Sequence, residues 1–150
     1  MIAEKTSTLI STFFLGDTLW GLDTLDAQEV IRVSEITKVH NAENYIIGII
    51  NLRGKIVTVI DLSRKLGIGF SKISELSRIV IVQWKEEYIG LLIDSISDVI
   101  DIEKNSLTSA PAAMNGTRGG YIDSVYQADQ KLIAILNIKA VLEVSEEGRD

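Results

Sequence analysis

The 150-residue sequence contains no cysteine and a single histidine, His40. Without cysteine the chain has no disulfide, no thiolate ligand for zinc and no thiol nucleophile. A single histidine excludes a site built from several imidazole ligands. His40 lies in a polar stretch with no serine in a strained elbow beside it, which is typical of a solvated loop residue rather than a general base. We therefore expect no catalytic residues, no metal and no cofactor, and the protein is predicted not to be an enzyme.

Other motifs of chemistry are equally scarce. Asp94, Asp98 and Asp101 do not have the spacing of a calcium-binding loop, and they fit an edge strand kept soluble by its charges. The glycines at residues 67–69 and 119–120 are too few for a phosphate-binding turn. The carboxylates are spread over predicted outer faces, so the pattern pairs no two of them for glycosidase chemistry.

Positive charge and long apolar runs are also lacking. The chain carries 15 Lys and Arg against 21 Asp and Glu, a net charge of −6, which disfavours nucleic-acid binding. No apolar run approaches the ~18–20 residues of a membrane span, and the first residues have no signal-peptide pattern. We expect no nucleic-acid partner, no direct membrane insertion and a cytoplasmic location.

Short apolar segments separated by turns are what the sequence has instead. A chain of this length buries about 68–70% of its unfolded surface, enough for one stable domain. Strand character is predicted at residues 9–15, 19–22, 29–33, 49–50, 56–60, 78–84, 88–93, 96–102, 121–126 and 131–136. Short helices are predicted at residues 63–66 and 138–144, a single turn at 23–28, a polar connection with Pro111 at 103–118, and a disordered acidic tail at 145–150.

The two halves of the chain, residues 9–66 and 78–142, are similar to each other. Leu19-Trp20-Gly21-Leu22 aligns with Tyr88-Ile89-Gly90-Leu91, and residues 55–62 align with residues 131–138. Any two apolar strands can be aligned by chance. Here, however, the glycine, acidic and lysine positions of the two halves also match, and they occur in the same order. The pattern predicts an internal duplication, with two small five-stranded β-barrels that pack on each other and are able to exchange strands.

One hairpin, at residues 48–62, combines apolar β-branched strands with a single cation in its turn. Gly54 is free to take a positive φ there, and Arg53 is the cation. Two interpretations stay open at this point. The guanidinium either crosses a barrel end to satisfy backbone carbonyls, which structure alone favours slightly, or is presented to a partner.

The same hairpin resembles the signature of CheW-type chemotaxis coupling proteins. The family pattern is a Gly-x-x-Asn-Leu-Arg-Gly turn, then an apolar strand that contains a proline and ends in Asp-Leu. Thr58 stands where the family has the proline. The resemblance runs from about residue 13 to residue 142. It implies a mostly β fold, two packed SH3-like five-stranded barrels with short helices, one of them C-terminal, within a single CheW-like domain over residues 1–150.

The resemblance also implies a function. Proteins of this family are non-enzymatic adaptors that couple transmembrane chemoreceptors to the CheA histidine kinase, at receptor arrays on the inner face of the membrane. One surface binds the hairpin tip of the receptor's coiled coil, and another binds the kinase's regulatory domain, which has the same fold. Carried over by position, the binding set is Ala27, Glu29, Gly48, Arg53, Ile56, Gly90 and Ile96.

Two alternative functions remain at this stage. The same fold serves as a regulatory or receptor-coupling module of a kinase or a receiver fusion, although no histidine-kinase or receiver motif is visible in this sequence. A small-molecule-binding barrel is the other alternative. It is disfavoured because barrels of this strand number are filled by their own side chains.

Overall fold

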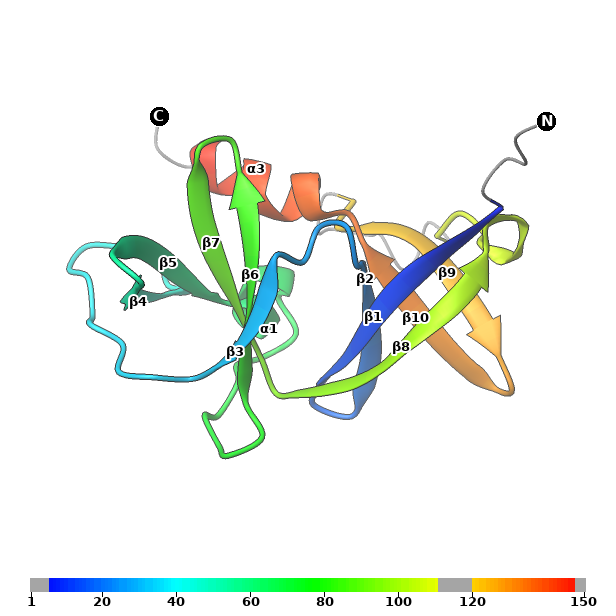
Figure 1. Cartoon of the computed structure of the whole chain (residues 1–150), viewed down its shortest axis with the longest axis horizontal. Helices are drawn as coiled ribbons and strands as arrows, with labels where there is room; N and C mark the ends of the chain where they lie inside the picture. Colours follow the sequence, from blue (N-terminus) through cyan, green and yellow to red (C-terminus); the bar gives the residue numbers. More distant parts are fainter. Residues whose placement is uncertain (1–5, 111–119, 148–150) are drawn as a thin grey trace.

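The structure, a computed structural model, describes residues 6–110 and 120–147. Their strands form two five-stranded sheets (Figure 1). The first sheet has the order β8-β1-β2-β10-β9 and is built from β1 (Ser7–Leu15), β2 (Thr18–Asp23), β8 (Ser95–Glu103), β9 (Ile122–Ala128) and β10 (Lys131–Leu136). The second has the order β3-β6-β7-β5-β4 and is built from β3 (Glu29–Arg32), β4 (Ile46–Leu52), β5 (Lys55–Asp61), β6 (Arg78–Trp84) and β7 (Glu87–Ile93).

The two sheets have the same topology, and each takes strands from both halves of the chain. β3 follows β2 in sequence but pairs with β6 of the second sheet, while β8 follows β7 but pairs with β1 of the first. In both sheets the second strand of the central hairpin pairs in parallel with its next neighbour, β2 with β10 and β7 with β5. The chain therefore crosses from the first sheet to the second between β2 and β3, and it returns between β7 and β8. The first two strands of each half share a sheet with the last three strands of the other half, an arrangement that we call the exchange of β3 and β8.

Each sheet is closed toward a barrel by one isolated bridge in an equivalent place. Beyond β3, Thr37 and Ile49 exchange backbone hydrogen bonds of 2.9 and 2.8 Å; beyond β8, Thr108 and Val125 exchange bonds of 3.0 and 2.8 Å. The first closure needs a glycine, because a Cβ on Gly48 would lie 2.2 Å from the Thr37 carbonyl oxygen.

Alternation of side chains along the strands produces three apolar clusters. The interior of the first barrel contains Ile10, Ile102, Ile133 and Ile135. The interior of the second contains Ile50, Val57, Val59, Ile79, Ile81 and Leu92. The third and largest cluster lies between the sheets and draws on both, with Phe13, Trp20, Leu22, Val80, Leu91 and Ile93 among its members.

Two helices end the two halves in matching ways. α1 (Leu62–Leu66) is capped by Asp61, whose Oδ1 accepts from Ser63 N at 3.1 Å, and it ends at Gly67 in the left-handed conformation. α3 (Ile138–Glu147) follows Asn137, whose Oδ1 accepts from Ala140 N at 3.2 Å. α3 runs from the end of β10 toward β7 (Figure 1). A short 3-10 helix, η1 (Lys104–Ser106), follows β8.

The predicted fold class, a mostly β pair of five-stranded barrels with short helices, is confirmed. One helix boundary was wrong: the helix was predicted to end at residue 144, but α3 continues to Glu147, since glutamates are good helix formers. The disordered tail stays a prediction. Residues 148–150, and Pro111 with most of the connection after residue 110, lie outside the described residues. The internal duplication of residues 9–66 and 78–142 stays a prediction.

Gly21 and Gly90 occupy the same place in the two sheets, and both are close to a β-branched side chain. A Cβ on Gly21 would lie 2.6 Å from Ile10 Cγ2, and one on Gly90 would lie 2.6 Å from Ile79 Cγ2. We expect Gly90→Ala to lower the free energy of unfolding by about 1–3 kcal/mol, because the stiff isoleucine must move in a packed interior. Urea unfolding measures this, with Ser106→Ala, exposed in η1, as the control. A loss below about 0.5 kcal/mol would show that the interior is not tightly packed there.

Candidate protein-interaction site

The β4–β5 hairpin presents Arg53 at its tip. β4 and β5 are joined by the two-residue turn of Arg53 and Gly54, which have φ angles of 51° and 86°, as a type I′ turn requires. Asn51 Oδ1 accepts a hydrogen bond from Gly54 N at 2.9 Å and holds the turn. The local sequence therefore fixes where Arg53 leaves the sheet, and its side chain is 71% exposed.

Arg53 forms an ion pair with Glu29 on β3. Its Nη2 donates to both carboxylate oxygens, at 2.5 and 2.7 Å. The pair links the β4–β5 turn to the opposite edge strand of the second sheet. The interpretation that Arg53 satisfies backbone carbonyls was wrong, because its partner is a carboxylate 24 residues earlier in the chain. The Glu29 side chain is 30% exposed, so solvent screens the pair.

A hollow of about 270 Å³ lies beside this ion pair. Residues of β3, β5, β6 and β7 line it, including Gln28, Glu29, Arg53, Lys55, Ile81 and Tyr88. Lys55 donates to the Tyr88 hydroxyl at 3.1 Å, and its ammonium lies 4.5 Å from the ring centre. The hollow thus combines a fixed cation, a carboxylate and an aromatic ring, which suits recognition of a polar protein surface.

The other predicted residues divide into surface and interior positions. Ile56 is 59% exposed on β5, and Ile96 is 44% exposed on β8 of the other sheet, opposite Phe13. Ala27 is half-buried and packs against the shared core. Gly48 and Gly90 are buried. These two glycines shape the barrel and offer no side chain to a partner, whereas Glu29 and Arg53 are brought into direct contact.

A second hollow, of about 310 Å³, contains residues that the sequence reasoning missed. It is lined by Leu25, Asp26, Gln28, Val82, Gln83, Lys85 and Ile138. Leu25 is 83% exposed, and a leucine inside a polar turn was a signal available in the sequence. Burial, with a smaller contribution from the Asp23 carboxylate, raises the pKa of Asp26. Gln28 lines both hollows, so the two form adjoining parts of one surface.

Among the described residues, no group of three or more His, Cys, Asp or Glu side chains is arranged to hold a metal ion. No helix in that same part of the chain is both long enough and apolar enough to span a membrane.

The protein is a double barrel made of two packed five-stranded sheets. Its candidate site, the ion pair of Arg53 and Glu29 with the hollows beside it, lies on the surface rather than in an internal cavity. Known proteins share this construction. The family model for the CheW-like domain matches residues 10–146, and the chain therefore belongs to the CheW-like domain family.

Individual relatives agree with this assignment. The chain is 28% identical to the chemotaxis protein CheW of Bacillus subtilis over 144 residues, which cover 95% of this chain and 92% of the relative. It is 28% identical to the chemotaxis protein CheW of Thermotoga maritima over 134 residues, covering 89% and 87%. Its fold superposes on the crystal structure of the scaffolding protein TtCheW from Thermoanaerobacter tengcongensis with a TM-score of 0.82 and 36% identity, covering 90% and 87%.

The energetic role of the ion pair between Arg53 and Glu29 is measured by a double-mutant cycle with Arg53→Ala and Glu29→Ala. We expect a coupling energy of about 0.2–1 kcal/mol in urea unfolding, reduced in high salt, because both side chains are accessible to solvent. Lys104→Ala, exposed in η1, is the control for loss of a surface cation. A coupling above about 2 kcal/mol would instead make the pair a structural brace.

Proposed function

We propose that the protein is a non-enzymatic adaptor that couples transmembrane chemoreceptors to a CheA-type histidine kinase. The observation that carries this proposal is the exposed ion pair of Arg53 and Glu29, set beside two hollows, in a chain of the CheW-like family. The contribution of such a protein is assembly, with no bond made or broken. We place its work in the cytoplasm, at receptor arrays on the inner face of the membrane.

The receptor's helical hairpin tip is proposed to dock on the surface that surrounds this ion pair. Exposed Ile56 and Ile96 offer apolar contacts, and Leu25 adds another that sequence reasoning missed. Arg53 exchanges its Glu29 partner for a receptor carboxylate at small cost, because an exposed pair is worth only about 0.2–1 kcal/mol. The proposed set remains Ala27, Glu29, Gly48, Arg53, Ile56, Gly90 and Ile96, with the two glycines acting through the backbone that they shape.

The kinase's regulatory domain is proposed to bind at a barrel of its own kind. β3 and β8 stand at sheet edges, and each carries an exposed valine, Val30 on β3 and Val99 on β8. Edge strands with apolar side chains are suited to pairing one barrel with another. Because β3 also carries Glu29, a partner on this edge senses the state of the Arg53 turn through a single strand.

Signalling follows from differential contact. If the adaptor binds one receptor state more tightly than the other, it shifts the equilibrium of the receptor-bound kinase by that difference and no more. By linkage, the kinase changes receptor affinity for the adaptor by the same factor.

A small-molecule function receives little support from the barrels. Both interiors are occupied by their own isoleucine, valine and leucine side chains, each at most 5% exposed. A barrel that is filled in this way has no central cavity for a ligand.

Co-sedimentation tests the proposal directly, using the full chain, a receptor cytoplasmic fragment and a CheA-type kinase. Wild type is expected to form the ternary complex. Arg53→Glu is expected to lose it, because the new carboxylate faces Glu29 and repels acidic receptor groups. Lys104→Glu makes the same charge reversal on η1 and is expected to behave as wild type.

The comparison requires that Arg53→Glu remains folded, which its circular dichroism spectrum and thermal midpoint establish. Equal sedimentation of Arg53→Glu and wild type would remove Arg53 from the receptor surface. If folded wild type binds neither component, the coupling function is wrong although the fold stands.

A further inference from the structure

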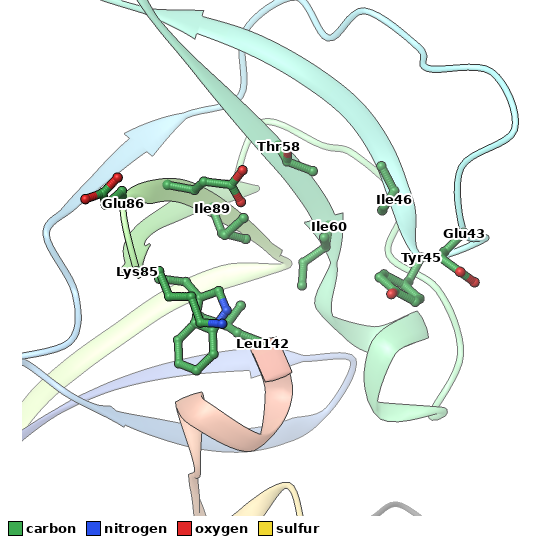
Figure 2. Close-up of a pocket in the computed structure, with 11 residues that line it drawn as sticks. Glu43, Tyr45, Ile46, Thr58, Ile60, Lys85, Glu86, Ile89 and Leu142 are labelled. Carbon is green, nitrogen blue, oxygen red and sulfur yellow. The ribbon is translucent and has the colours of Figure 1, made fainter. Parts of the chain in front are cut away.

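A hollow lies at the end of the second barrel, beside α3 (Figure 2). Its volume is about 620 Å³, within the range of sites that hold a peptide segment or a small ligand. Figure 2 shows Leu142 of α3 on one side, with Ile46 of β4 and Thr58 of β5 on the other. The lining comprises Glu43, Tyr45, Ile46, Thr58, Ile60, Trp84, Lys85, Glu86, Glu87, Ile89 and Leu142. We call this hollow the α3 pocket.

The first barrel has a counterpart of the α3 pocket, and there the chain seals it. Matching hydrogen bonds align the two places: Asp61 N donates to Tyr45 O, and Asn137 N donates to Tyr121 O, both at 2.7 Å. In the α3 pocket Tyr45, Thr58, Trp84 and Ile89 are half-exposed. Their counterparts by strand position, Tyr121, Ala134, Leu15 and Trp20, are all buried, at 9% exposure or less. Among the residues that the structure describes, one barrel end is therefore covered by the chain and the other is left open.

An indole in the wall of the pocket is also incompletely satisfied. Trp84 Nε1 is buried and has no hydrogen-bond acceptor in the described part of the chain. A buried donor without an acceptor costs about 1–3 kcal/mol. This atom is closed to solvent, as is Trp20 Nε1 in the shared core, so a bound segment contacts the half-exposed ring of Trp84 rather than its N–H.

The charge around the α3 pocket is predominantly negative. Glu43, Glu86 and Glu87 line it, and within the described residues none of the three side chains forms a hydrogen bond or ion pair. The cations nearby are turned onto aromatic faces: Lys85 lies 5.5 Å from the Trp84 ring centre, and Lys65 lies 4.0 Å from that of Tyr45. Burial lowers the pKa of Lys65, while the Glu43 carboxylate opposes that shift.

We propose that the α3 pocket binds a segment of a partner protein in which an apolar side chain is flanked by lysine or arginine. The apolar side chain enters between Ile89 and Leu142, where it gains the burial that the counterpart site obtains from its own residues. The flanking cations meet the glutamates at the rim, which favours basic over acidic segments. This site is separate from the ion pair of Arg53 and Glu29 and requires neither receptor nor kinase.

The test uses ¹⁵N-labelled full-length protein and follows the two indole N–H signals by NMR. The probe is the peptide acetyl-Lys-Leu-Arg-amide, and acetyl-Glu-Leu-Glu-amide is its charge-reversed control. The basic peptide is expected to shift the Trp84 signal in a saturable way and to leave that of Trp20 unchanged. The double variant Glu86→Gln with Glu87→Gln is expected to raise the Kd about fivefold, the effect of losing two solvent-exposed charge contacts.

A matched variant separates the local effect from loss of net charge. Asp98→Asn with Asp101→Asn also removes two exposed carboxylates, but from β8 of the first sheet, and is expected to leave the Kd unchanged. Equal binding of the acidic peptide, or no shift at Trp84 in the folded protein up to ~10 mM peptide, would overturn the proposal. Phenethylammonium binding as tightly as the basic peptide would also overturn it, in favour of a site for small organic cations.

Discussion

The exchange of β3 and β8 is the constraint on which the rest of the structure depends. If β3 lay beside β1 and β2, which precede it in the chain, the second sheet would lose an edge strand and its ion-paired Glu29. The same holds for β8 and the first sheet. Each barrel is thus completed by the other half, and the largest apolar cluster lies between them. Neither half has a closed sheet or a covered core alone, so folding of one requires folding of the other.

Completing the barrels moves function to the surface. The interiors are filled by β-branched and leucine side chains, and the edges of each sheet are joined by backbone bridges at Thr37 and Thr108. The turns and the outer faces of the strands are then the places where binding residues can lie, and the rigid scaffold holds them in position. Arg53 illustrates this arrangement. Its turn is fixed by positive φ angles and by Asn51, while its side chain is exposed and its ion pair with Glu29 is accessible to solvent.

Local signals in the sequence were sufficient to predict where the strands lie, but not which strands pair with each other. Short apolar segments between turns predicted ten strands, and the matching glycines Gly21 and Gly90 with the alignment of residues 55–62 and 131–138 predicted two similar halves. The pairing of β3 with β6 was not predictable from them, because exchanged and unexchanged strands have the same local pattern. The partner of Arg53 was missed because Glu29 is 24 residues earlier in the chain and comes close only when the two edge strands of the second sheet, β3 and β4, approach each other.

The predicted binding set combined two kinds of residue that a family resemblance does not separate. Carrying over the family's binding residues by position selects two kinds of residue: those whose side chains are exposed, and those that shape the backbone under the surface. Gly48 is buried under the Thr37 carbonyl, and Gly90 is buried against Ile79, whereas Arg53 and Ile56 are exposed. Burial distinguishes them, and burial is a property of the tertiary fold. Leu25 was missed for the converse reason: it belongs to no motif, and only the folded chain shows it beside Gln28 and Ile138.

Equal topology does not require equal surfaces, and this is why a double barrel suits an adaptor. Within the described residues, the first barrel covers its end with Trp20 and Tyr121, while the second leaves the equivalent end open and surrounds it with carboxylates. Substitutions at these outer positions leave the interior clusters and the exchanged strands untouched, because they lie on the opposite face of each strand. Two sheets of equal topology therefore present different outer surfaces on one shared core.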